Sequence, residues 1–166
     1  MRNSSHTGGM RVSFDLDEVL FVSPLTHKAE PELPFPLNRI FKERLRLGTP
    51  ELIRRLQDEG FEVWVYTSSF RSIRYIQHLF YWYGVTFDGI VNATRHMKEV
   101  QRNRKELLPS KMPNYYRISL HIDDETVVAT SGKIYGFNVY QLDQQDEQWA
   151  QSVMDRVYEI KRREKF

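Results

Sequence analysis

The sequence predicts an α/β fold, a three-layer α/β/α sandwich on a mainly parallel sheet. The main observation is that strand-like apolar patterns alternate along the chain with patterns of helical period, which is typical of a parallel sheet covered by helices. A second observation is "FEVWVYT" at 61–67, an almost continuous apolar run of the kind found in strands buried on both faces. With 166 residues, 40% of them hydrophobic, the chain is long enough for one well-packed domain and short for two.

Five segments are predicted to be strands. They are expected at 10–15, 61–67, near 85–91, at 116–125 and at 134–142. The first carries Val12 and Phe14 in alternation, and the fourth alternates Ile118, Leu120 and Ile122, so each has a period of two. The fifth, "IYGFNVYQL", has a similar apolar content.

Three segments have a helical period, and together with the strands they give a Rossmann-like arrangement. They are expected at 49–60, 70–84 and 146–163. The first has Thr49 as its N-cap, Pro50 at its first helical position and Gly60 as its C-terminal stop. The second ends at Gly84. Apolar residues at helical spacing define the inner faces of the second and third helices: Phe70, Ile73, Ile76, Phe80 and Tyr83, then Trp149, Val153, Val157 and Ile160.

Two internal segments do not fit this alternation. Residues 22–48 contain four prolines and end in the basic helical piece "NRIFKERLRLG", so we predict a flap over the sheet edge. Residues 92–117 are polar and basic, with a short helix expected before Pro109. We expect residues 1–9 to form a disordered tail and 10–166 to form a single domain.

Composition excludes several classes of protein. No apolar run approaches the roughly 20 residues of a membrane helix, and the N-terminus lacks a secretory apolar stretch. The chain has no cysteine, which excludes disulfides and thiolate metal sites and favours a cytoplasmic location. With 24 Lys and Arg against 22 Asp and Glu, the charge gives no strong nucleic-acid signature. The five histidines follow no zinc-ligand pattern, and we assign them no role.

Polar residues lie at the carboxyl ends of three predicted strands. The first strand delivers Asp15 and Asp17, the second delivers Thr67 with Ser68 and Ser69, and the fourth delivers Asp123 and Asp124. Ligands of open α/β sheets bind beyond the carboxyl ends of the strands, so these side chains are the candidates for a site. Converging carboxylates repel one another unless a cation compensates, and a set of oxygen ligands suits Mg²⁺. The sequence therefore predicts a magnesium site that also receives a phosphate.

These residues resemble the four motifs of the haloacid dehalogenase superfamily, in their order. The matching elements are Asp-x-Asp-x-Val at 15–19, Thr67 after a strand, a basic residue at 111 and Asp-Asp at 123–124. The resemblance spans residues 10–142. Glu18 and Val19 are tolerated variants of the first motif.

The resemblance implies a magnesium-dependent phosphatase. In similar proteins the first aspartate, here Asp15, attacks phosphorus and forms an aspartyl-phosphate, and Asp17 protonates the leaving oxygen and later activates water. Thr67 and Ser68 would bind the phosphoryl group together with the N-terminus of a helix expected near Ser69. The metal would be held by Asp15, Asp17 (commonly through its backbone carbonyl), Asp123 and Asp124.

The motif lysine has more than one candidate. Lys111 precedes the acidic strand in a Lys-x-Pro run that resembles the motif of some small members of the superfamily, and we favour it. Lys105 and Lys98 lie farther upstream and stay open. A lysine here would balance the charge of phosphate and nucleophile.

Other functions and the substrate stay open from the sequence. A receiver domain has its acidic pair at the first strand, whereas here a pair comes last. A binding or regulatory module for nucleic acid or protein, without turnover, would use the basic strip "RHMKEVQRNRK" at 95–105. The gaps between the motifs hold no full cap domain, so we expect an open site that admits a small phosphate ester or a phosphorylated macromolecular end. The oligomeric state is not predicted.

Overall fold

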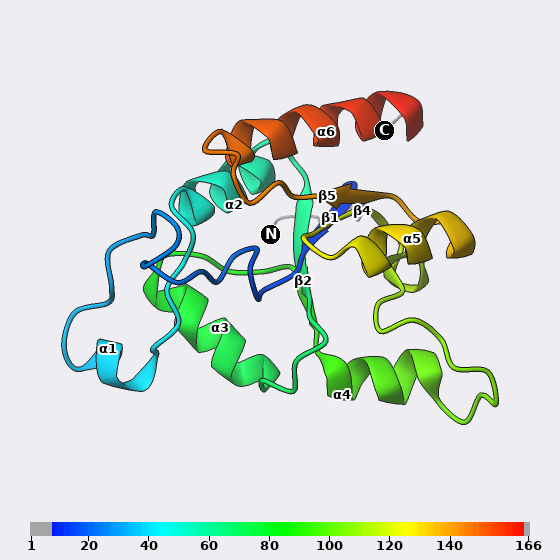
Figure 1. The fold of residues 1–166 in the computed structure, drawn as a ribbon, viewed down its shortest axis with the longest axis horizontal. Helices are drawn as coiled ribbons and strands as arrows, with labels where there is room; N and C mark the ends of the chain where they lie inside the picture. Colours follow the sequence, from blue (N-terminus) through cyan, green and yellow to red (C-terminus); the bar gives the residue numbers. More distant parts are fainter. Residues whose placement is uncertain (1–7, 165–166) are drawn as a thin grey trace, which may run out of the picture.

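The computed structural model describes residues 8–164, and residues 1–7 of the predicted tail lie outside this range. The described chain forms one sheet of five parallel strands in the order β3-β2-β1-β4-β5, with helices on both faces (Figure 1). The strands are β1 (Arg11–Phe14), β2 (Glu62–Tyr66), β3 (Gly89–Val91), β4 (Ile118–Asp123) and β5 (Val139–Gln141). The predicted α/β/α sandwich is confirmed, and the sheet is parallel throughout.

The helices divide between the two faces of the sheet. They are α1 (Leu37–Ile40), α2 (Thr49–Asp58), α3 (Ile73–Trp82), α4 (Ala93–His96), α5 (Thr126–Tyr135) and α6 (Trp149–Glu164), with the π-helical turn η1 (Met97–Gln101) and the 3₁₀ turn η2 (Pro113–Tyr116). Helices α2, α3 and α6 lie on one side of the sheet, and α4 and α5 lie on the other (Figure 1). Within residues 8–164, no helix is both long and apolar enough to cross a membrane.

The alternation of side chains along each strand separates two apolar clusters. In β2, Val63 and Val65 join the large cluster under α2, α3 and α6, whereas Trp64 and Tyr66 join a smaller one with Tyr116 on the opposite face. The predicted inner face of α6 is confirmed, since its four apolar residues are buried in the large cluster. Both faces of the sheet are therefore covered, as a parallel sheet requires.

Strand β1 lies in the middle of the sheet, and its register sets the position of the site. Phe14 pairs with Val65 of β2 on one side and with Ile122 of β4 on the other. The residues that follow these three positions, Asp15, Tyr66 and Asp123, therefore lie side by side at the carboxyl edge of the sheet. Asp15 still donates its backbone N–H to the carbonyl of Ile122 at 3.0 Å, which fixes its backbone against β4.

The entry to α2 differs from the prediction. Thr49 is the first helical residue and not the N-cap, which is Gly48 with a left-handed φ of 92°. At this first helical position the Thr49 hydroxyl is buried without a hydrogen-bond partner among the described residues. The predicted stop is confirmed, since Gly60 follows the C-cap with a φ of 92°.

Helix α5 is absent from the sequence prediction, and the fifth strand is shorter than expected. The segment predicted as strand from 134 belongs to α5 as far as Tyr135, and β5 begins only at Val139. Only Val128 and Gly132 of α5 are buried. The helix therefore has no long buried apolar stripe that a helical period in the sequence would indicate. Gly132 packs closely, because a Cβ there would lie 2.6 Å from the Phe137 carbonyl oxygen.

The two irregular segments contain less helix than predicted. In the flap at 22–48, helix is confined to α1, and Leu45 and Arg46 are extended, pairing with Phe21 and Ala29. The "NRIFKERLRLG" helix is therefore wrong for most of its length. In the second segment, α4 and η1 end at Gln101, earlier than the expected stop before Pro109.

The predicted inner face of the second helix gives a test of the core. Phe80 is fully buried between the rings of Phe21 and Phe87, whereas Phe70 lies before α3 and is 76% exposed, so its predicted burial is wrong. Phe80→Ala should lower the free energy of unfolding by about 3–5 kcal/mol, and Phe70→Ala should change it by less than about 0.5 kcal/mol. Urea unfolding of both variants measures this difference, and equal losses would contradict the packing.

Candidate active site

Carboxylates from two neighbouring strands meet at the carboxyl edge of the sheet. Asp15 directly follows β1, and Asp123 is the last residue of β4. Both side chains are buried. On the other side of β1, the buried Thr67 directly follows β2, and its backbone N–H donates to the Val91 carbonyl at 2.9 Å. The convergence at this edge agrees with the rule that ligands of parallel sheets bind there.

A buried ammonium group lies between the two carboxylates. The Nζ atom of Lys111 is 2.6 Å from Oδ2 of Asp123 and 3.2 Å from Oδ1 of Asp15, and the lysine is 2% exposed. Lys98 and Lys105 are both exposed. Of the three candidate lysines, the geometry brings only Lys111 to the acidic residues.

The segment that carries Lys111 is anchored to the sheet through Tyr66 of β2. Its neighbour Met112 donates a backbone N–H to the hydroxyl of Tyr66 at 3.1 Å, and that hydroxyl lies 2.6 Å from Nδ1 of His96. Tyr66 is the last residue of β2, adjacent to Thr67. The lysine and the threonine are therefore positioned through one buried tyrosine.

A histidine that the sequence analysis left without a role supports Asp123. His121 is fully buried, with Nε2 at 2.8 Å from Oδ2 of Asp123 and Nδ1 at 2.7 Å from the Ser13 hydroxyl. Burial lowers the pKa of His121, so the neutral ring donates from Nε2 to the carboxylate and accepts from Ser13. A strand places residues two apart on one face, and the His-x-Asp spacing was the available signal for this contact.

Burial and charge push the pKa values of the two central carboxyl groups apart. Burial raises the pKa of Asp15 to about 7, against the opposing charge of Lys111. Burial also acts to raise the pKa of Asp123, but the His121 hydrogen bond and Lys111 together lower it below its ordinary value. Burial disfavours the charge of Lys111, yet the two carboxylates raise its pKa above its ordinary value. The lysine is therefore charged and Asp123 is ionised.

The donor set suits a hard divalent cation. Asp15, Asp123, Asp124 and Glu125 each offer an oxygen, and these atoms lie within 4.8 Å of one another. Burial and the neighbouring Asp123 raise the pKa of Asp124, a strain that a cation would relieve. All of these ligands are oxygens, which is the chemistry of a Mg²⁺ site. Glu125 was not among the predicted ligands.

The side chain of Asp17 lies apart from this group. It is 53% exposed and forms a two-pronged ion pair with Arg71, at 2.8 and 2.9 Å. Its backbone carbonyl accepts no backbone hydrogen bond among residues 8–164. Of the atoms of Asp17, the carbonyl oxygen is the one that is free to serve a cation.

The predicted phosphate-binding segment has a different geometry from the one expected. The Thr67 hydroxyl donates to the Ser69 hydroxyl and accepts from the Ser69 N–H, both at 3.1 Å, and Ser68 is exposed. Helix α3 begins at Ile73 after the N-cap Ser72, so the expected helix start near Ser69 is wrong. This segment offers a phosphate its hydroxyl groups and loop backbone.

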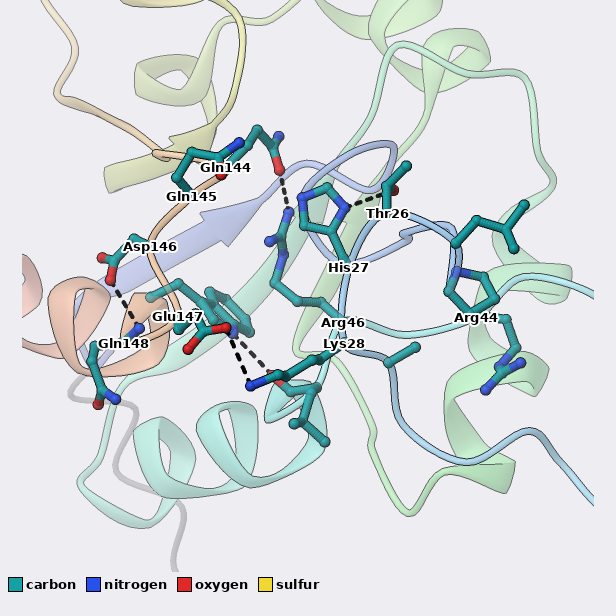
Figure 2. A pocket seen from close by; sticks show the side chains of 15 residues that line it. Thr26, His27, Lys28, Arg44, Arg46, Gln144, Gln145, Asp146, Glu147 and Gln148 are labelled. Carbon is teal, nitrogen blue, oxygen red and sulfur yellow. Dashed lines mark hydrogen bonds and ion pairs between the residues drawn. The ribbon is translucent and has the colours of Figure 1, made fainter.

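A cavity of about 660 Å³ lies between the flap and the loop before α6 (Figure 2). In its wall, the buried Arg46 donates to the backbone carbonyls of Val19 and Glu18 at 2.7 and 2.8 Å and to the side chain of Gln144. Gln144 also donates to the Glu18 carbonyl at 2.7 Å. Glu18 has a left-handed φ of 62°, and this double contact braces the backbone next to Asp17.

Comparison with solved structures shows the fold. An uncharacterized protein from Listeria monocytogenes serotype 4b matches with a TM-score of 0.59 and 15% identity, over 92% of this chain and 99% of that one. A HAD-superfamily hydrolase from Geobacter sulfurreducens PCA matches with a TM-score of 0.57 and 14% identity, over 89% and 99% of the two chains. The chain has a haloacid dehalogenase-like fold.

The haloacid dehalogenase-like fold is also shared with a structure that holds ligands. A D,D-heptose 1,7-bisphosphate phosphatase from B. bronchiseptica, complexed with magnesium and phosphate, matches with a TM-score of 0.50 and 14% identity, over 89% of this chain and 86% of that one. No protein-family profile and no curated protein sequence matches this chain.

The raised pKa of Asp15 predicts a pH-dependent stability difference in metal-free protein. Between pH 3.8 and about 7, folded Asp15 keeps a proton that the unfolded chain releases. The folded state then binds more protons, so the contribution of Asp15 to the free energy of unfolding falls as pH rises through this window. The neutral Asp15→Asn variant lacks this loss. The free energy of unfolding of the variant minus that of the parent should therefore rise from pH 4 to 7.

Urea unfolding in chelator at a series of pH values measures this difference. Other titrating groups are common to both proteins, so the comparison isolates the residue at position 15. Excess Mg²⁺ should shrink the difference, because a cation favours the ionised carboxylate. Parallel pH profiles of the two metal-free proteins would show that the pKa of Asp15 is not raised.

Proposed function

We propose that the protein is a magnesium-dependent phosphohydrolase that acts on phosphate monoesters through an aspartyl-phosphate on Asp15. One observation carries the proposal: a buried carboxylate at the end of the central strand touches a buried ammonium group, beside a cluster of oxygen ligands. Turn residues have no reason to converge in this way. A nucleophile, a charge-balancing lysine and a cation site do.

In the first step, a carboxylate oxygen of Asp15 attacks phosphorus and the ester P–O bond breaks. The attack requires an ionised Asp15, and Lys111 at 3.2 Å favours that form. Thr67 and Ser68 donate to phosphoryl oxygens, and the Lys111 charge offsets negative charge as it develops. Asp17 donates a proton to the leaving oxygen, so the product departs as a neutral alcohol.

In the second step, water hydrolyses the aspartyl-phosphate. Asp17, now a carboxylate, takes a proton from the water as it attacks phosphorus, which restores Asp15 and releases phosphate. Mg²⁺ held by Asp15, Asp123, Asp124 and the Asp17 carbonyl would supply positive charge against the repulsion between phosphate and carboxylates. Asp123 keeps its position through His121 and through the Glu125 N–H at 3.0 Å.

The structural neighbours support this proposal at the level of reaction class. They include a HAD-superfamily hydrolase and a bisphosphate phosphatase complexed with magnesium and phosphate. The alternative of a binding module gains less support from the structure. Arg95 of the basic strip is turned inward, where it donates to the Ile90 carbonyl and pairs with Glu99.

The first test is metal-dependent turnover. Purified protein should hydrolyse an aryl phosphate in Mg²⁺, and EDTA should abolish the reaction until Mg²⁺ is restored. Asp15→Asn should reduce turnover to background, because the nucleophile is lost. Mass spectrometry after rapid quench should find phosphate on Asp15 of the parent. Activity that persists in chelator or in Asp15→Asn would refute the mechanism.

The second test compares a buried with an exposed lysine. Lys111→Ala should lower kcat by about 10²–10³, the usual cost of removing one preorganised charge from a developing anion. Lys105→Ala is the matched control and should leave kcat within about twofold, because Lys105 is exposed and is not among the groups that shift the pKa of Asp15. Circular dichroism should first show that both variants fold. The reverse ranking would assign the role to Lys105.

A further inference from the structure

The position of Arg71 is fixed by the backbone around it. Its carbonyl accepts a hydrogen bond from the side chain of Asn92 at 3.0 Å, and the next residue, Ser72, caps α3. Two residues earlier, the carbonyl of Ser69 accepts from the Ala93 N–H at 2.9 Å. The arginine therefore stands at a defined place, immediately after the segment proposed to bind phosphate.

The Arg71 side chain extends from this point to Asp17 and to the flap. Its two terminal nitrogens contact the two oxygens of Asp17, at 2.8 and 2.9 Å, and its Nε contacts Glu43 of the flap at 3.1 Å. The guanidinium lies 5.1 Å from the centroid of the Phe21 ring. Asp17 is the residue proposed to protonate the leaving oxygen, so the guanidinium lies on the leaving-group side.

The contact with Asp17 is of a kind that a substrate can replace. The Asp17 side chain is 53% exposed and that of Arg71 is 26% exposed, so a substrate can reach the pair from solvent. When Asp17 turns to the leaving oxygen, the two terminal nitrogens of Arg71 lose their partner. A planar guanidinium binds two oxygens of a carboxylate or phosphate well, so an anion is the group that fits there.

The scissile phosphate itself is not this anion. In the proposed reaction it faces Asp15, Thr67 and Lys111, all of which are buried, whereas Arg71 contacts the exposed side chain of Asp17. Glu43, supported by the hydroxyl of Tyr75, retains Nε and orients the guanidinium plane. The free edge is then the one toward the leaving group.

We propose that Arg71 selects phosphate monoesters whose leaving group carries a second anionic group, a carboxylate or a phosphate, within a few bonds of the scissile oxygen. This inference rests on the proposed function, because it places the leaving group beside Asp17. A carboxylate and a phosphate can each present two oxygens to the planar guanidinium. The experiment below distinguishes these two groups.

The experiment compares matched pairs of substrates that differ by one anionic group. Glycolic acid phosphate is paired with ethyl phosphate, and 1,3-propanediol bisphosphate is paired with propyl phosphate. For at least one pair, the parent should show a kcat/KM at least about tenfold higher for the member with the second anionic group. This is the size expected for a charged hydrogen-bonded contact. The pair with the larger ratio identifies carboxylate or phosphate as the second group.

Variants of Arg71 assign the preference to this side chain. Arg71→Gln should abolish the ratio within a pair, and Arg71→Lys should keep part of it, since lysine retains the charge but not the planar fork. Arg74→Ala is the matched control, an exposed arginine of α3 three residues on, and should keep the ratio. Glu43→Gln should also keep it, because the glutamine amide oxygen can still accept from Nε and hold the guanidinium plane. An arginine that only tied down the flap would instead make Glu43→Gln and Arg71→Gln equivalent.

A binding measurement keeps the inference separate from turnover. Calorimetric titration of parent and Arg71→Gln protein with both members of each pair, in Ca²⁺ in place of Mg²⁺, should show tighter binding of a member with the second anionic group, and this difference should depend on Arg71. Failure of the parent to hydrolyse any phosphate ester refutes the proposed function, and binding then decides the role of Arg71. Equal binding of the members with and without the second anionic group, or an unchanged ratio in Arg71→Gln, overturns the inference.

Discussion

The buried contact of Lys111 with Asp15 and Asp123 is the interaction on which the carboxyl edge of the sheet depends. Parallel pairing of β1 and β4 brings two carboxyl groups out of water side by side, and their repulsion opposes that pairing. One ammonium group, 2.6 and 3.2 Å from them, offsets the repulsion. Removing one member of a buried ion pair typically costs about 3–5 kcal/mol, because the others are left uncompensated.

The same contact explains why the polar groups beneath the site are so completely paired. Asp123 has one oxygen shared by Lys111 and His121, and its other oxygen accepts the Glu125 N–H. His121 in turn has Ser13 on its second nitrogen. A buried network of this kind is stabilising only when every member has a partner, and a fully paired one holds a single arrangement of side chains.

Much of the site could be predicted from the sequence, because period and strand ends are local properties. Asp15, Thr67 and Asp123 each lie at the carboxyl end of a recognisable strand, and a parallel sheet brings such residues to one edge. The direction of the Asp17 side chain could not be predicted in this way. It is set by Arg71, 54 residues away in sequence, and only the folded chain brings the two together. Helix α5, whose apolar period is weak, and the N-cap at Gly48 were not predicted, because tertiary packing decides both.

The anchoring of Lys111 through Met112 and Tyr66 has a consequence for the dynamics of the molecule. The chain from η1 to η2 is irregular, and a surface segment with few backbone ladder bonds usually opens at little cost. Here, opening would withdraw the ammonium group and leave two buried carboxylates facing each other across the central strands. Amide protons of this segment should therefore exchange with solvent more slowly than those of an ordinary loop. Their rates should approach those of β1 and β4, whose carboxyl groups Lys111 contacts.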